Sequence, residues 1–305
     1  MSVSDNNQYL AMLDDKYPFN LFRPECNGTT IFPPHWHNDC LELIYVRQGQ
    51  VELHIGGHSF IGQAGDLILI GEGVIHSGYI VDGPPDYYTI LLDRSRLASS
   101  DFMNVASRSM LTGRLHLPVV LQTGNDGYEA CTAIVRSIIE EYVGRRAGFE
   151  LAIKSYLHVL LLELARAYGE QAGGKDARDE AAKRSMERLK EAISLIESRY
   201  TVRLTVGEAA RAAGMSTYHF CRVFKHAVGR TFTEYMHLYR IGKAEALIRD
   251  TDLPITRIAE QTGFGTVQYL DELFKRYRGC TPMQLRRRPV QLTPSSRTAT
   301  NPPLE

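Results

Sequence analysis

Two histidines and a glutamate in the segment HWHNDCLELIYVRQG have types and a spacing that suit metal chemistry. His35 and His37 are one residue apart, Glu42 comes five residues after His37, and Gly49 follows seven residues later. Imidazole and carboxylate groups are common ligands of first-row transition metals. The following residues LELIYVR have the pattern of a β-strand. The sequence therefore raises the hypothesis of a metal site at the start of a strand.

The region that must position these side chains, residues 28–92, consists of short segments with period-two alternation. These segments are LELIYVR, QVELHI, DLILI and YYTILL. The turn-forming sequences QGQ, IGGHS, GQAGD and VDGPPD separate them. Short strands at close, regular spacing predict a β-sandwich or a small barrel.

The hydrophobic period changes between residues 127 and 168. The segments CTAIVRSIIEEYVG and ELAIKSYLHVLLLELARAY have apolar residues at intervals of three and four, which predicts two helices interrupted near RRAGF. The second helix carries a group of leucines whose apolar surface has two interpretations: packing against the strands, or a dimer contact. The group comprises Leu157, Leu160, Leu161 and Leu164.

Length and composition are those of an ordinary soluble protein with room for two domains. The chain has 305 residues, of which 44% are hydrophobic and 23% charged. The polar, acidic N-terminus and the lack of a long apolar run argue against a signal peptide and a membrane span, so we expect a cytoplasmic protein. The five cysteines are odd in number and have no close pair spacing, which argues for reduced thiols. They are Cys26, Cys40, Cys131, Cys221 and Cys280.

A formal net charge of zero conceals two oppositely charged regions. Residues 183–290 contain 20 Lys and Arg against 11 Asp and Glu, and the rest of the chain contains 15 against 24. A basic region joined to an acidic one indicates a polyanion-binding module attached to a domain with another role. We expect a first domain at 1–168, a polar linker at 169–184, a helical domain at 185–288 and a disordered tail at 289–305.

The helical domain contains an internal repeat. AARAAGMSTYHFCRVFKHAVGRTF and RIAEQTGFGTVQYLDELFKRYRGCTP share their glycine and phenylalanine positions, so that Phe224 matches Phe274 and Gly229 matches Gly279. Each unit reads as a short helix, a turn at glycine and a second helix, which is the helix-turn-helix arrangement. A plain pair of packed helices is the alternative, but two copies in a basic region favour DNA binding. The units span about 207–228 and 255–278.

The second helix of the first unit has one apolar face. Phe220, Phe224 and Ala227 recur at helical spacing, so the residues between them should point outward. These predicted outward residues are Thr217, Tyr218, Cys221, Arg222 and Lys225.

The segment from LTVGEAARAAG to FKRYRGCTP resembles the DNA-binding domain of AraC/XylS-type transcription regulators over about 100 residues. The resemblance implies seven helices and two recognition helices in successive major grooves, about 34 Å apart. It also implies base contacts by Tyr218, Cys221 and Arg222 in the first unit and by Val267, Gln268, Asp271 and Glu272 in the second. Thr217, Lys225, Thr266 and Lys275 complete the predicted DNA-binding set.

Asp271 and Glu272 depart from that family pattern, in which a small polar residue and then a basic one are usual. Two carboxylates repel phosphates, and their specific use would be to accept from the amino group of cytosine. The alternative is that they pair with Lys275 or Arg276 along the helix.

The N-terminal third resembles a cupin, the small β-barrel that serves such regulators as a sensor. His35, His37, Glu42 and Gly49 fit the first cupin motif, and GDLILIGEGVIH fits the second, with Gly71 in the usual proline position and His76 in the fourth ligand position. This resemblance implies a site for iron, manganese or zinc. The main alternative is an effector pocket or structural polar cluster, in which Trp36 and Tyr45 would stack against a sugar or another small ring. His54 and His58 flank a GG hairpin and are expected to be solvated.

The fold class predicted from these patterns is α+β with two domains, a cupin-like barrel with accessory helices followed by an all-α domain. The predicted function is a sequence-specific transcription regulator that responds to a small-molecule effector and is not an enzyme. Double-stranded DNA, a second copy of the chain and RNA polymerase are its expected partners, with no membrane partner. No cofactor is required, although a divalent metal ion could occupy the barrel. A metal-dependent cupin enzyme tethered to DNA is the rival interpretation.

Overall fold

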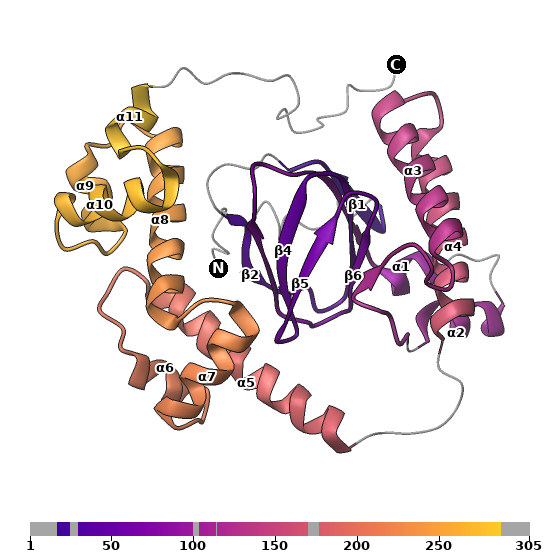
Figure 1. Ribbon diagram of the computed structural model, residues 1–305, viewed down its shortest axis with the longest axis horizontal. Coiled ribbons are helices and arrows are strands. Elements are labelled where there is room, and N and C mark those ends of the chain that lie inside the picture. The colour runs from indigo at the N-terminus through magenta and orange to yellow at the C-terminus, as the bar shows by residue number, and fades with distance from the viewer. Residues whose placement is uncertain (1–16, 25–29, 100–103, 114, 170–176, 288–305) are drawn as a thin grey trace.

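The chain forms a sheet-rich N-terminal domain and a helical C-terminal domain (Figure 1). The structure is a computed structural model, and it describes residues 17–24, 30–99, 104–113, 115–169 and 177–287. Helices α3 and α4 lie on one side of the strands, and the helical domain lies on the opposite side (Figure 1). The predicted α+β class with two domains is confirmed.

The strands pair antiparallel in two sheets. The first sheet has the order β1 (Phe19–Phe22), β8 (Asp86–Leu92), β3 (Leu41–Gln48), β6 (Leu67–Ile70) and β9 (Val120–Leu121). The second has the order β2 (Thr30–His35), β7 (His76–Ile80), β4 (Gln50–Ile55) and β5 (His58–Gln63). The prediction of short strands was therefore right, but in the described part of the chain the strands form two separate sheets rather than one closed barrel.

Strand β3 separates two cores. Its even-numbered residues, such as Ile44, join a cluster shared by both sheets, while its odd-numbered residues, such as Leu43 and Tyr45, join a cluster formed with α3 and α4. Successive side chains of a strand point to opposite faces, so burial on both sides explains why LELIYVR contains few polar residues.

In the described part of the N-terminal domain, four helices accompany the sheets: α1 (Arg94–Ala98), α2 (Val105–Thr112), α3 (Tyr128–Gly144) and α4 (Phe149–Tyr168). The chain reverses between α3 and α4 through left-handed residues at Arg145 and Gly148, close to the predicted break. Leu157, Leu160, Leu161 and Leu164 are all buried in the core that α4 shares with the first sheet. Of the two interpretations of these leucines, packing within the chain is right, and a dimer contact through them is wrong.

The helical domain contains seven helices within residues 177–287, as the family resemblance implied. They are α5 (Ala177–Arg199), α6 (Val206–Ala212), α7 (Thr217–Val228), α8 (Phe232–Asp250), α9 (Ile255–Gln261), α10 (Val267–Arg278) and α11 (Pro282–Arg287). Both predicted helix-turn-helix units are present, as α6–α7 and α9–α10. None of the described helices is both long and apolar enough to cross a membrane.

The predicted linker at 169–184 differs from the structure. Helix α5 begins at Ala177, so the second half of that segment is helical, whereas residues 170–176 lie outside the described residues. The alanines and alternating charges of ARDEAAKR favour a helix once the segment is joined to the apolar positions that follow it. The predicted tail, 289–305, also lies outside the described residues.

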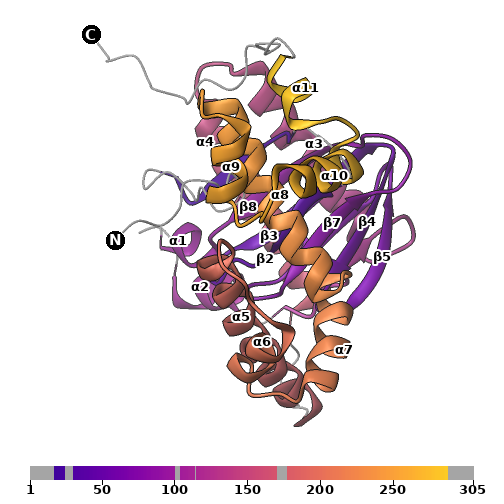
Figure 2. The same cartoon turned by 90° about the vertical axis from the view of Figure 1, so that its left-hand side faces the viewer.

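Two hydrophobic clusters hold the helical domain together, one beneath each helix-turn-helix unit, and α8 contributes to both. The cluster beneath the first unit also contains Ile75 of the N-terminal domain, and Trp36 packs against it. The two domains thus share a core at this point, where the helical domain stands in front of β7 and β4 (Figure 2).

Candidate nucleic-acid interface and buried polar cluster

Helices α7 and α10, here called the reading helices, begin and end in the same way. Ser216 accepts a hydrogen bond from the backbone N–H of His219, at 3.3 Å, and Thr266 accepts one from that of Tyr269, at 3.2 Å. These N-caps satisfy backbone donors that a helix start leaves free. Gly229 and Gly279 end the two helices in the left-handed conformation, with φ of 75° and 71°.

The outward face of α7 is the one predicted from its periodicity. Phe220, Phe224 and Ala227 are buried, and Tyr218 is 82% exposed. All five predicted DNA-binding residues of this helix are exposed, namely Thr217, Tyr218, Cys221, Arg222 and Lys225. The helix therefore presents two cations and an aromatic ring on one surface.

Helix α10 follows the same pattern with two exceptions. Thr266, Gln268, Glu272 and Lys275 are exposed, as predicted. Val267 is only partly exposed, because it packs against the cluster beneath the second unit. Asp271 is also partly covered, and this burial raises the pKa of its carboxyl group.

The two units carry opposite charges at an equivalent position. Alignment on Phe224 and Phe274 places Arg222 opposite Glu272. Glu272 pairs with Arg276 one turn later, at 3.1 Å, which is the helical pairing considered as an alternative to base contact. Sequence reasoning did not separate these two alternatives, because an exposed i,i+4 pair and a groove-facing carboxylate give the same pattern.

The N-terminal domain contains a buried polar cluster where β2 ends and β7 begins. His35 is the last residue of β2, His76 is the first residue of β7, Glu42 lies on β3, and His37 lies in the loop between β2 and β3. All four side chains are buried, and one nitrogen or oxygen from each lies within 4.8 Å of the others. The four residues predicted from the two motifs are thus brought together from both sheets.

One carboxylate oxygen of Glu42 faces the three imidazoles. Glu42 Oε2 lies 2.8 Å from His76 Nε2, 3.4 Å from His37 Nε2 and 3.9 Å from His35 Nε2. His35 Nε2 and His76 Nε2 are 3.1 Å apart. Burial alone would raise the pKa of Glu42, but the adjacent imidazoles of His76 and His37 lower it below its usual range, so the carboxylate is ionised.

Backbone carbonyls orient two of the imidazoles. His35 Nδ1 lies 2.8 Å from the carbonyl oxygen of Pro33, and His76 Nδ1 lies 2.8 Å from that of Val74. Each Nδ1 can bond a carbonyl oxygen only as a donor, so in a neutral ring Nε2 carries the lone pair. Burial, followed by the charge of His76, lowers the pKa of His35 to about 3, which keeps that ring neutral.

Trp36 and Tyr45, the two aromatic residues expected to stack on an effector at this cluster, have other packing partners. The ring of Trp36 packs against the helical domain, with Lys190 Nζ 5.6 Å from its centroid. The hydroxyl of Tyr45 accepts a hydrogen bond from Arg136 of α3, at 3.0 Å. Tyr45 and Glu42 are an odd number of residues apart on β3, so they point to opposite faces of the sheet. An aromatic stacking platform at the cluster is therefore not formed by these two residues.

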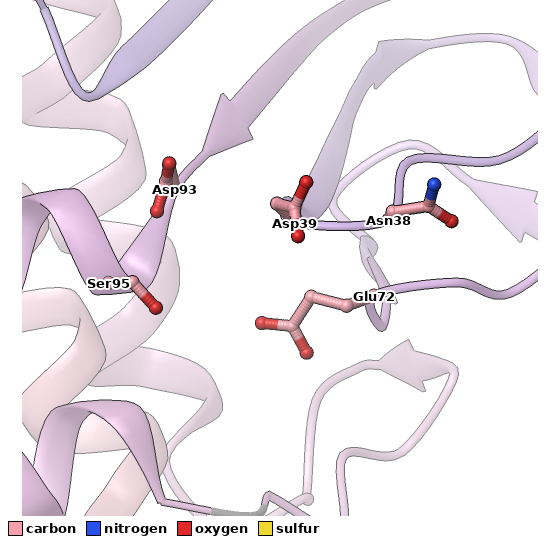
Figure 3. A pocket seen from close by; sticks show the side chains of 5 residues that line it. All are labelled: Asn38, Asp39, Glu72, Asp93 and Ser95. Atoms are coloured by element: carbon pink, nitrogen blue, oxygen red, sulfur yellow. The ribbon is translucent and has the colours of Figure 1, made fainter.

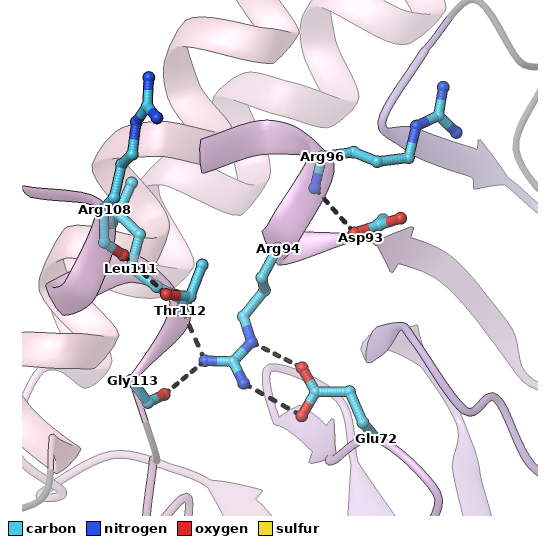
Figure 4. Close-up of polar contacts among 8 residues, drawn as sticks. All are labelled: Glu72, Asp93, Arg94, Arg96, Arg108, Leu111, Thr112 and Gly113. Carbon is cyan, nitrogen blue, oxygen red and sulfur yellow. Dashed lines mark hydrogen bonds and ion pairs between the residues drawn. The ribbon is translucent and has the colours of Figure 1, made fainter. Parts of the chain in front are cut away.

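A pocket of about 370 Å³ is lined in part by residues that are close in sequence to the cluster. None of its lining residues was predicted from the sequence to be functional. Asn38, Asp39, Glu72, Asp93 and Ser95 line it (Figure 3). Arg94 bonds both carboxylate oxygens of Glu72, at 2.6 and 3.1 Å, and also the carbonyl oxygens of Leu111 and Gly113 (Figure 4). Arg94 of α1 thus joins Glu72, in the loop between β6 and β7, to the end of α2 beside this pocket.

The contact between the domains was also missed by sequence reasoning. Ser77 and Tyr79 of β7 both donate hydrogen bonds to the carbonyl oxygen of Val228, at 3.1 and 2.9 Å. His54, which was expected to be solvated, is buried here, between hydrogen bonds to Ser59 and Glu52. The expectation was wrong for His54 because Gly229 packs directly against its ring.

Comparisons with known proteins agree with this architecture. Residues 209–288 match a helix-turn-helix domain family, and residues 25–103 match the AraC-like ligand binding domain family. The chain is 21% identical over 270 residues to the uncharacterized HTH-type transcriptional regulator YdeC of Bacillus subtilis (strain 168), covering 86% of this chain and 91% of YdeC. It is 32% identical over 94 residues to the HTH-type transcriptional activator AarP of Providencia stuartii, covering 31% of this chain and 70% of AarP.

Among solved structures, the chain is similar to the C-terminal domain of AraT, a response regulator from Geobacillus stearothermophilus. The identity is 31%, the match covers 33% of this chain and 84% of that one, and the TM-score is 0.32. The two helix-turn-helix units, the sheet-rich domain before them, the two family matches and the match to AarP lead to one conclusion: the chain belongs to the AraC family of transcription regulators, with an AraC-like ligand-binding domain followed by a DNA-binding domain.

Proposed function

We propose that this regulator reads DNA with the outward faces of α7 and α10 and that α7 supplies most of the sequence specificity. The observation that carries the proposal is the repeated unit, in which equivalent caps and cores leave equivalent surfaces exposed. Arg222 is the residue best suited to a bidentate contact with guanine, and Tyr218 and Cys221 lie on the same face. On α10, Gln268 is suited to a contact with adenine. The carboxylate of Glu272 pairs with Arg276 and would have to leave this pair to contact a base in the groove.

The N-terminal domain is the proposed sensor, which binds a small effector and alters how the reading helices meet DNA. The buried polar cluster supports this role, because it gathers four buried polar side chains next to the apolar core that the two sheets share. Because Trp36 packs against the helical domain and Tyr45 lies on the opposite face of β3 from Glu42, the proposal does not include a sugar stacked on these two rings. The rival function, a metal-dependent enzyme tethered to DNA, gains no support from the relatives, which are transcription regulators.

The assembly in which the regulator acts is part of the same proposal. We place it in the cytoplasm as a homodimer that binds double-stranded DNA and contacts RNA polymerase. Because the four leucines of α4 are buried, a dimer contact through this helix would use its outer surface, where Leu151 and Val159 are exposed. DNA binding as such should need no cofactor, because side chains and helix ends supply the contacts.

The experiment that tests the function is selection of a binding site from a random DNA pool with the full chain, followed by titration at two salt concentrations. With about six phosphate contacts, raising the salt from 50 to 200 mM should weaken binding on the order of a thousandfold. Random-sequence DNA of equal length is the control. Salt-insensitive binding, or failure to enrich any sequence, would contradict the proposal.

A further inference from the structure

We propose that Tyr269, held by His237 of α8, contacts a DNA phosphate beside reading helix α10, and that His237 is thereby a positioning residue of the second helix-turn-helix unit. The contact is one element of the DNA interface, so it rests on the proposed function. Neither residue belongs to the DNA-binding set predicted from the sequence.

Tyr269 lies at the edge of the exposed face of α10. Its neighbour Gln268 and the later Glu272 are exposed, whereas Leu270 and Leu273 are buried. At about 100° per residue, Tyr269 falls between these two groups, and 39% of its surface is exposed. When a helix lies in the major groove, its outermost residues reach the bases, and residues at its edges lie closest to the phosphates that border the groove.

Two neighbours hold the ring of Tyr269 at this edge, where α10 packs on α8 (Figure 2). Its hydroxyl oxygen lies 2.9 Å from Nε2 of His237, and the two ring centroids are 5.8 Å apart with an interplanar angle of 85°. The ring also meets that of Phe264, with centroids 6.0 Å apart and an angle of 67°. Aromatic rings favour such edge-to-face contacts. An exposed hydroxyl is thus fixed before DNA binds, which lowers the entropy cost of the contact.

The electrostatic environment of this pair is positive and comes from both helices. Burial, followed by the charges of Arg240 on α8 and Arg276 on α10, lowers the pKa of His237, and Glu234 on α8 opposes this shift. The carboxylate of Glu234 already accepts hydrogen bonds from the backbone N–H and the hydroxyl of Thr231 at the start of α8. A phosphate at the phenol would therefore meet a site at which positive charge prevails.

The proton on His237 decides what the phenol can do. If Nε2 carries the proton, it donates to the phenol oxygen, and the O–H of Tyr269 is left to donate to an outside acceptor. If Nε2 carries the lone pair, the phenol donates to His237 instead and has no proton for a phosphate. A protonated imidazole has N–H groups at both positions, so protonation of His237 enforces the arrangement that suits a phosphate.

The contact therefore links DNA binding to proton uptake. A phosphate favours the charged imidazole, so the pKa of His237 should be higher in the complex than in the free chain, where it lies below the ordinary value of 6.5. The complex then holds more protons than the free protein. As the pH falls from above the higher pKa towards the lower one, DNA affinity should rise, by at most about tenfold per pH unit for one proton.

The phosphate contact is tested with Tyr269→Phe in the full chain, which keeps the ring and removes the hydroxyl. We expect the affinities for the selected site and for random DNA to fall by the same factor, about tenfold, because a phosphate carries no sequence information. Tyr277→Phe is the matched control on the same helix, since Tyr277 packs against the cluster beneath the second unit, and it should bind like wild type. Unchanged affinity in Tyr269→Phe, or a loss confined to the selected site, would overturn the contact.

The positioning role is tested with a double-mutant cycle. His237→Ala should weaken DNA binding about fivefold in the wild-type background and should have no further effect in Tyr269→Phe, because both changes remove one contact. Additive losses would overturn the role of His237, since a residue that merely supports the fold would act independently of the hydroxyl. If His237→Ala does not fold, the pH response of the next variant decides.

That variant is His237→Gln, whose amide N–H can still donate to the phenol but cannot take up a proton. At pH 8 its DNA affinity should lie within about twofold of wild type. Between pH 8 and about pH 5.5, the affinity of wild type should rise more steeply than that of His237→Gln, at one fixed salt concentration. His116→Gln, an exposed histidine of the N-terminal domain, is the control and should keep the wild-type response. Equal pH responses of His237→Gln and wild type would overturn the proton linkage.

Failure of this contact differs from failure of the proposed function. If Tyr269→Phe and wild type bind DNA equally while wild type selects a site with strong salt dependence, the regulator stands and the contact is wrong. If wild type enriches no sequence and binds DNA without salt dependence, the proposed function is wrong and the contact falls with it.

Discussion

The two helix-turn-helix units have the same backbone plan but different surroundings. Phe224 and Phe274 occupy equivalent core positions with 0% exposure, and Gly229 and Gly279 end the two reading helices. A Cβ atom on Gly229 would lie 2.5 Å from the ring of His54, whereas one on Gly279 would meet nothing within 4 Å. The N-terminal domain therefore packs directly against Gly229 of the first unit. The space beside the equivalent Gly279 of the second unit is free of such a contact.

This difference shows that the same helix-turn-helix plan is used once in contact with the N-terminal domain and once without that contact at the helix end. Strands β7 and β4 pack on the end of α7, so this helix is in direct contact with the N-terminal domain. Helix α10 instead carries Glu272 paired with Arg276, where α7 has the exposed Arg222. The first unit therefore combines an exposed arginine with a contact to the N-terminal domain, and the second unit has neither at the equivalent positions.

The largest expected effect is on stability, from Phe224→Ala and Phe274→Ala. Each deletion should lower the free energy of unfolding by about 3–5 kcal/mol, because each leaves a cavity in a close-packed cluster. Only the cluster around Phe224 contains Ile75 and contacts Trp36, the single tryptophan. In urea unfolding, Phe224→Ala should therefore shift the tryptophan fluorescence transition more than Phe274→Ala does. Equal shifts would contradict a core shared between the domains.

The next effect is on DNA recognition, from Arg222→Ala and its counterpart Glu272→Ala. Loss of a bidentate guanine contact should reduce discrimination between the selected site and random DNA by about 1–3 kcal/mol for Arg222→Ala. Glu272→Ala should leave that discrimination within about 0.5 kcal/mol of wild type if its carboxylate only pairs with Arg276. Competition binding at one fixed salt concentration measures both. A uniform loss on all DNA in Arg222→Ala would show that Arg222 contacts a phosphate instead.

The third comparison uses Gly229→Ala and Gly279→Ala. Both residues are left-handed, so each alanine should destabilise its helix end by about 1–2 kcal/mol. Gly229→Ala should cost more, because the added methyl group also meets His54. Thermal and urea unfolding of the two variants give the difference. Equal losses would indicate that the N-terminal domain does not hold this end of α7 in solution.

The smallest effect concerns Asp271→Ala/Glu272→Ala. If these carboxylates face the groove, removing both should raise the affinity for random DNA and narrow the ratio of selected to random binding. If they only form helical pairs, the change should cost at most about 0.5 kcal/mol of stability per pair. The ratio of the affinities for the selected site and for random DNA, measured at one fixed salt concentration, distinguishes the two cases. A ratio equal to that of wild type would leave α7 as the main source of specificity.

Features that depend on local pattern could be predicted from the amino-acid sequence. Helical periodicity and the repeated glycines located α6–α7 and α9–α10, and the outward residues of α7 followed from Phe220, Phe224 and Ala227. The strand alternation would also have excluded Tyr45 from the cluster of Glu42, because the two residues are an odd number apart on one strand. The burial of the four α4 leucines could not be read from periodicity, since the same apolar face suits either a dimer or the chain's own core.

Contacts between residues far apart in the chain could be identified only from the folded protein. Four side chains from β2, the following loop, β3 and β7 converge because two sheets face each other, and only their packing fixes the 2.8 Å between Glu42 and His76. The placement of β7 against α7 likewise depends on residues far apart in the chain, Ser77 and Tyr79 with Val228. Local sequence sets the period of a helix or strand, but contacts over such separations follow from how complete elements bury their apolar faces together.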